Sequence, residues 1–171
     1  IGFALACSAL VWMLCAVMPA SWALLGAILF LFNARAFLEW GQTYWGGGVA
    51  MAGGALLFGG LLRVRERLSV LDGLAMAVGL VVLANTRQLE GALAGTAAAL
   101  VGLLWIRRRW SSGERRAVLG KLGLPLLVAC LAIAAWTLFY NARLTGDPLS
   151  LVYSHWSPWD AHAELIRGYR G

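Results

Sequence analysis

The chain has 171 residues, of which 61% are hydrophobic and only 13% are charged, and its mean hydropathy is +0.75. A soluble domain of this length could not bury so much apolar surface, because small domains have a large surface that must be mostly polar. The net charge is +6, but the basic residues lie in short segments between apolar runs. This pattern indicates a membrane protein and argues against a nucleic-acid-binding one.

Six apolar runs follow one another along the chain, at residues 1–18, 20–32, 45–63, 70–84, 91–106 and 118–140. The third run is rich in glycine, which is common in membrane helices because small residues let backbones approach closely. We therefore predict an all-α fold, a polytopic transmembrane helix bundle of about six spans over residues 1–140. A polar and aromatic segment, residues 141–171, follows as a loop or interfacial segment.

The fourth and fifth runs are each near fifteen residues long. At 1.5 Å per residue a helix of that length spans about 22 Å, less than the roughly 30 Å of a hydrocarbon core. Short fourth and fifth helices would draw their connection, residues 85–90, below the membrane surface or into a water-filled cavity.

The chain begins inside an apolar run and without an initiator methionine. We therefore interpret it as a fragment of a larger protein. A signal peptide is the alternative for the first run, but it would begin with a basic region, and here another apolar run follows at once. Its three cysteines, Cys7, Cys15 and Cys130, lie in apolar runs at spacings that match no zinc site.

The distribution of charged residues predicts how the chain is oriented across the membrane. Loops 63–67 and 107–121 carry nine basic residues, against Glu66, Asp72 and Glu114 on the same side. Charges on the opposite side balance, so the whole +6 excess falls on one face, as the positive-inside rule requires. We predict a multi-pass protein of the bacterial inner membrane, with both basic loops in the cytoplasm and residues 141–171 in the periplasm.

Three polar clusters fall on the predicted periplasmic side. The first, between the second and third spans, consists of Arg35, Glu39, Gln42 and Tyr44. Arg35 and Glu39 are four residues apart, so on a helix they form either an interfacial ion pair or a ligand-facing pair.

The second cluster is Asn85, Arg87 and Glu90, in the short connection between the fourth and fifth spans. Charged residues at membrane depth are costly and point to function. The guanidinium of Arg87 could hold a phosphate with its planar fork of donors, while Glu90 balances it or orients a sugar hydroxyl. The structural alternative is mutual neutralisation of the two charges.

The third cluster is the C-terminal segment. Arg143 lies at its start, and residues 146–148 (Gly-Asp-Pro) predict a turn. His155, Asp160 and His162 are residue types that bind divalent cations, at a spacing that is not diagnostic. A solvated or interfacial amphipathic segment is the alternative, and we assign no metal site.

Three segments carry a family resemblance: QTYWGGGVA at residues 42–50, NTRQLEG at 85–91 and YNARLTGDPL at 140–149. In this order they resemble bacterial GT-C type membrane glycosyltransferases, polytopic enzymes related in architecture to protein O-mannosyltransferases and aminoarabinose transferases. The resemblance implies transfer of a sugar from a polyprenyl-phosphate donor to an acceptor on the periplasmic face.

The resemblance also implies a catalytic Asp or Glu in a large periplasmic loop after the first span, which we expect upstream of Ile1. This chain would supply the donor side, with Arg87, and with Arg35 or Arg143, neutralising the lipid phosphate. Two other functions stay open, a transporter or flippase for a lipid-linked or hydrophobic solute and a non-catalytic assembly subunit. No span carries the chain of acidic residues of a proton-coupled pump, which disfavours transport.

Overall fold

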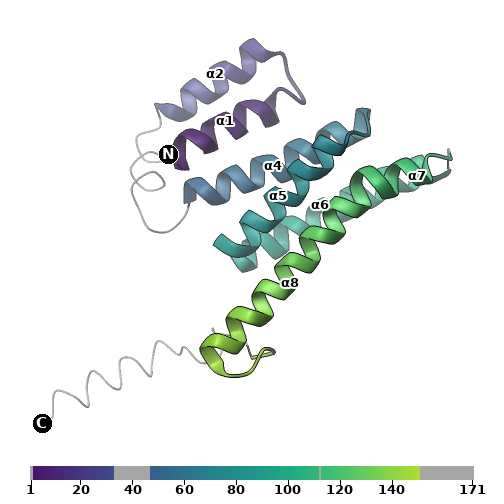
Figure 1. Ribbon diagram of the computed structural model, residues 1–171. Helices are drawn as coiled ribbons and strands as arrows, with labels where there is room; N and C mark the ends of the chain where they lie inside the picture. Colours follow the sequence, from purple (N-terminus) through teal and green to yellow (C-terminus); the bar gives the residue numbers. More distant parts are fainter. Residues whose placement is uncertain (1, 33–46, 112, 151–171) are drawn as a thin grey trace, which may run out of the picture. The chain divides into compact units, whose positions relative to one another are not determined.

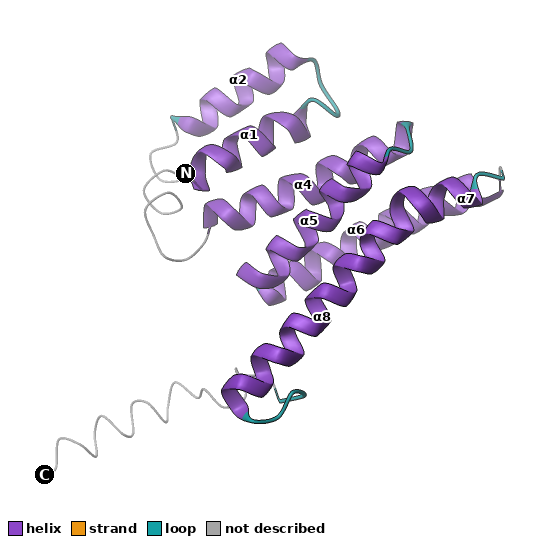
Figure 2. Cartoon of the chain, viewed as in Figure 1, coloured by secondary structure: helices purple, strands orange, loops and turns teal. Residues whose placement is uncertain are grey.

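The computed structural model describes residues 2–32, 47–111 and 113–150, and all regular secondary structure in this part of the chain is helical, with no β-strand (Figures 1 and 2). In chain order the elements are α1 (Gly2–Leu14), α2 (Ala20–Leu31), α4 (Gly47–Glu66), α5 (Val70–Thr86), α6 (Gln88–Ser111), α7 (Arg115–Val118), the π-helical turn η1 (Leu119–Gly123) and α8 (Leu124–Thr145). The predicted all-α fold is confirmed.

The chain divides into two compact units, Ile1–Cys130 and Leu131–Gly171, with the division inside α8. In the first unit α4 is the central helix, because α1 packs on one side of it and α5 on another (Figure 1). α6 packs against α5 and α4. The buried core joins Leu57, Leu61 and Val64 of α4 to Met76 of α5 and Leu122 of η1.

Glycine allows the close packing of α4. A side chain at Gly53 would lie 3.1 Å from the backbone oxygen of Gly79, and one at Gly60 would lie 2.7 Å from that of Asp72. On the α1 side Gly59 faces the ring of Trp12. The glycine-rich run therefore serves helix packing, as its composition predicts.

α5 and α6 form a hairpin with a single residue, Arg87, between them. The side chain of Ser69 caps the start of α5 by accepting a hydrogen bond from the amide of Leu71 at 3.2 Å. At the hairpin, a Cβ on Gly91 would lie 2.9 Å from the carbonyl carbon of Leu83. Only glycine lets the two helices meet this closely.

Within the residues that the structure describes, three helical stretches are long and apolar enough to cross a membrane, namely Gly47–Glu66, Leu89–Arg107 and Arg115–Thr145. The apolar helices α1, α2 and α5 are shorter. The number of six spans stays a prediction, because only half of the six predicted runs form helices of that length.

The predicted short fourth helix is confirmed, since α5 has 17 residues, but the predicted short fifth helix is wrong. α6 has 24 residues, about 36 Å at 1.5 Å per residue. The apolar run understates its length because the helix continues through polar residues at both ends. Long basic side chains can extend from a helix end toward water, so Arg107 and its neighbours need not end the helix.

Candidate functional site

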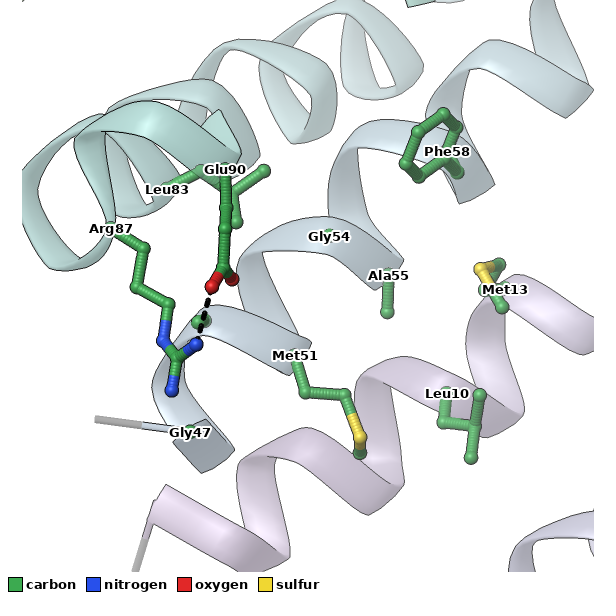
Figure 3. Close-up of a pocket in the computed structure, with 11 residues that line it drawn as sticks. Leu10, Met13, Gly47, Met51, Gly54, Ala55, Phe58, Leu83, Arg87 and Glu90 are labelled. Atoms are coloured by element: carbon green, nitrogen blue, oxygen red, sulfur yellow. Dashed lines mark hydrogen bonds and ion pairs between the residues drawn. The ribbon is translucent and has the colours of Figure 1, made fainter. Parts of the chain in front are cut away.

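The first unit contains a cavity of about 340 Å³ between α1, α4, α5 and the start of α6 (Figure 3). Its walls come from α1 (Leu10, Met13), α4 (Gly47, Ala50, Met51, Gly54, Ala55, Phe58) and α5 (Leu83), and its polar atoms from Arg87 and Glu90. This size lies in the range of small-molecule sites, which combine apolar walls with a few polar groups.

Small residues on α4 make the cavity hollow. Gly54 lines it, and no atom would lie within 4 Å of a Cβ at that position. Ala50 and Ala55 lie on either side of Gly54 in the sequence, while Met51 and Phe58 supply the larger side chains of the α4 wall. Methionine side chains are flexible and polarizable, so this wall can adapt to an apolar group.

The polar end of the cavity is built at the α5–α6 turn. Arg87 directly follows α5 as its C-cap residue, with its amide donating to the carbonyl oxygen of Leu83 at 2.9 Å. Its guanidinium Nη1 lies 2.5 Å from Oε1 of Glu90, in the first turn of α6, and Figure 3 shows the two side chains meeting. The side chains are 33% and 59% exposed, so water and ligands can reach both.

This arrangement can hold an anion beside an apolar group. An arginine presents five N–H donors, and Glu90 takes one of those of Arg87. Within the described residues the other donors of Arg87 have no protein acceptor. A phosphate can therefore bind Arg87 while the ion pair with Glu90 persists, and the second carboxylate oxygen of Glu90 can accept a hydroxyl.

Asn85 lies on the same turn but is not among the residues that line the cavity. It is exposed, and its Nδ2 donates to the carbonyl oxygen of Val81, 2.9 Å away on its own helix. The structure therefore brings together Arg87 and Glu90 of the second cluster and points Asn85 elsewhere.

Arg143 lies in the second unit, in the last turn of α8. It is exposed, and its guanidinium carbon is 5.8 Å from the ring centre of Phe139. The turn predicted at residues 146–148 is confirmed: Gly146 has φ +78°, and Oδ1 of Asp147 accepts from the amide of Leu149 at 2.9 Å.

The remaining candidates lie outside the described residues. They are Arg35, Glu39, Gln42 and Tyr44 of the first cluster, and His155, Asp160 and His162 of the C-terminal segment. Within the part of the chain that the structure describes, no group of three or more histidine, cysteine or acidic side chains could hold a metal ion.

The sequence did not identify the apolar walls. Leu10 and Met13 belong to α1 and face residues of α4 that are some forty positions later in the chain. Nothing in the local pattern sets them apart from lipid-facing residues, because both environments favour the same side chains. The one available signal is Gly54, a small residue in an apolar helix, and glycine there also fits helix packing.

No family model, curated protein or solved structure matches this chain.

Proposed function

We propose that the cavity is the donor site of a membrane glycosyltransferase that uses a polyprenyl-phosphate sugar, with Arg87 binding the phosphate. The observation that carries the proposal is the pairing of an arginine and a carboxylate with an otherwise apolar wall in one cavity. A lipid-linked donor has the matching chemistry, an anionic phosphate joined to a hydrocarbon chain.

The positive charge of Arg87 complements the negative charge that develops on the phosphate leaving group during sugar transfer. An acceptor hydroxyl oxygen bonds to the anomeric carbon, the bond from that carbon to the phosphate oxygen breaks, and the electron pair of the broken bond goes to the phosphate. The hydroxyl proton goes to a carboxylate base, which the resemblance to GT-C enzymes leads us to expect outside this chain. A guanidinium held beside the phosphate stabilises the leaving group where its charge develops.

Glu90 has a supporting role in this proposal. Its ion pair with Arg87 holds the guanidinium at the cavity, and its remaining oxygen accepts a hydroxyl of the sugar. The site would face the periplasm, because the α5–α6 turn lies at the opposite end of α5 from the basic segment 63–67. Positive-inside orientation places that basic segment in the cytoplasm of a bacterial cell.

The test is sugar transfer from a polyprenyl-phosphate sugar by the full-length protein in liposomes. Arg87→Ala should reduce turnover by at least about a hundredfold, because one charged donor to a transition-state oxyanion is worth that much. Arg87→Lys should recover part of the activity, since it restores the charge but not the fork of donors.

The matched control is Thr86→Ala on the same turn. Thr86 is exposed, and its hydroxyl donates to the carbonyl oxygen of Val82 on its own helix. This variant should transfer sugar normally. Normal turnover by Arg87→Ala would refute the donor site, and movement of the intact lipid across the bilayer without any transfer would identify a flippase.

A further inference from the structure

A second feature, independent of the cavity, is a concentration of positive charge at one end of the first unit. We call it the basic end, and it consists of Arg63, Arg65, Arg67, Arg107, Arg109, Arg115, Arg116 and Lys121. These residues lie where α4 ends, where α6 ends, and in α7 and η1 (Figure 1). Orientation alone requires only that such charges fall on one side of the membrane.

The structure goes further and joins the two basic segments into one surface. Nη2 of Arg109 donates to the carbonyl oxygen of Arg65 at 3.1 Å. Nζ of Lys121 donates to the carbonyl oxygen of Leu68 at 3.0 Å. Both acceptors are neutral backbone groups near the end of α4, so these contacts hold the segments together without cancelling their charge.

Acidic side chains neutralise only part of the basic end. Nε of Arg67 lies 3.5 Å from Oδ2 of Asp72, and Nη1 of Arg109 lies 2.9 Å from Oε2 of Glu114. The third acid, Glu66, lines a small polar cavity with Arg63 and Arg67. The eight basic residues of the basic end, whose side chains the structure describes, thus outnumber the three acids, and like charges close together repel unless another anion lies among them.

Among the described residues, at least two arginines are available to such an anion. Arg65 and Arg116 are exposed, and neither forms an ion pair with an acidic residue in the described ranges. Arg115 is also exposed and lies 5.6 Å from the ring centre of Trp110. The indole of Trp110 sits at the end of the apolar helix α6, a position that tryptophan favours at the headgroup level of a bilayer.

We propose that the basic end binds anionic phospholipid headgroups of the leaflet that it faces. In this proposal the arginines meet the lipid phosphates at the headgroup level, where each guanidinium can bind a phosphodiester with two donors. Basic clusters next to membrane helices attract anionic lipids through the same charge complementarity. The lipid headgroup is the partner because the surface is fixed to the end of a helix long and apolar enough to span the bilayer.

The experiment measures which lipid the purified full-length protein retains. The protein is placed in mixed micelles of detergent with equal amounts of phosphatidylglycerol and phosphatidylcholine. Native mass spectrometry then measures the ratio of the two lipids that stay bound. The wild type should favour phosphatidylglycerol. The double variant Arg65→Gln/Arg116→Gln should lower that preference by about tenfold, and 1 M salt should lower it as well.

The matched control is Arg65→Lys/Arg116→Lys, which keeps the charge and should keep the preference. Both side chains are exposed, so folding should be intact in all variants, and circular dichroism checks it. Equal retention of the two lipids by the wild type would overturn the proposal, as would an unchanged preference in the glutamine variant. Complete competition by 10 mM inorganic phosphate would also overturn it, since the site would then take free phosphate and not a lipid.

Discussion

At Gly54 a single missing side chain keeps the cavity open. A Cβ there would meet no atom within 4 Å, so Gly54→Leu fills the cavity without disturbing the packing of α4. We expect this variant to fold and to lose at least about tenfold in affinity for a fluorescent polyprenyl phosphate, because a buried leucine takes the space of several methylene groups.

Gly120→Leu is the control for that experiment, since Gly120 is exposed in η1, away from the cavity, and has equally open surroundings. It should bind the probe as the wild type does. If Gly54→Leu binds normally as well, the lipid chain does not enter the cavity and only the phosphate contact of Arg87 is left to test.

Gly79, unlike Gly54, lies in close contact with the backbone of a neighbouring helix. A Cβ there would lie 2.5 Å from the backbone oxygen of Gly53 and 2.6 Å from the amide nitrogen of Leu57. Backbone atoms cannot move aside as a flexible side chain can, so Gly79→Ala must push α4 and α5 apart. We expect a loss of about 1–3 kcal/mol in the free energy of unfolding, measured with a denaturant in detergent micelles.

Gly54→Ala is the matched comparison for Gly79→Ala. The same methyl group enters open space at this position, and alanine favours a helix more than glycine does. Its stability should equal or exceed that of the wild type. An equal loss of unfolding free energy in both variants would mean that close packing of α4 against α5 is not the reason why Gly79 stabilises the fold.

The sequence singled out the polar residues that line the cavity more readily than the apolar ones. Arg87 and Glu90 stand out because charges are rare and costly inside an apolar chain, and the structure pairs them in the cavity. Asn85 was included in the predicted cluster only because it is close to Arg87 in the sequence. Its side chain instead donates a hydrogen bond to a carbonyl oxygen of its own helix. Met13 and Phe58 depend on which helices face each other, which a local pattern cannot show.

At the scale of elements, Arg63 links α1 to α4. Its guanidinium lies 3.9 Å from the ring centre of Trp12, with Nη2 donating to the carbonyl oxygen of Trp12 and Nη1 to that of Gly59. A cation–π contact contributes about 0.5–2 kcal/mol, and a hydrogen bond from a charged group about 1.5–3 kcal/mol. One side chain therefore holds the end of α1 against α4.

We expect Arg63→Gln to loosen α1 selectively. Hydrogen exchange of the amides in Gly2–Leu14 should be faster by at least about tenfold, while exchange in α5 should change little. Arg65→Gln is the control, because Arg65 is exposed and its side chain has no such contact with α1. Uniform acceleration along the whole chain would show that Arg63 supports the entire fold and not this one contact.

Helix boundaries were the weakest part of the sequence-based prediction. Apolar runs identify where a helix is buried or in lipid, but backbone hydrogen bonds continue into polar residues. That is why α6 is longer than its apolar run, while α5, bounded by Ser69 and by Arg87 with Gly91 close behind, matches its run closely. The turn at residues 146–148 was easier to predict, because Gly-Asp-Pro is a clear turn signal.

At the scale of the whole molecule, charge and helix length together predict which ends face which side. The stretch Arg115–Thr145 has 31 residues, about 46 Å as a helix, which exceeds the roughly 30 Å hydrocarbon core. It is therefore long enough to cross once. Its start belongs to the basic end and its finish leads to the turn at Gly146.

Cysteine labelling tests this orientation. In a background with Cys7, Cys15 and Cys130 replaced by alanine, one new cysteine is placed at Glu114 or at Leu149, both of which are exposed. A membrane-impermeant maleimide added to intact cells with a permeable outer membrane should label the Leu149→Cys variant. It should label the Glu114→Cys variant only after the inner membrane is opened.

Because the basic residues are expected to set the orientation in the membrane, a variant with fewer of them provides the control. Replacing Arg107, Arg115 and Arg116 by glutamate reduces the positive excess of the basic end, and the positive-inside rule then predicts mixed labelling of Glu114→Cys in intact cells. Equal labelling of both single cysteines in the otherwise unchanged protein would contradict the orientation. It would also contradict the proposed periplasmic position of the Arg87 cavity.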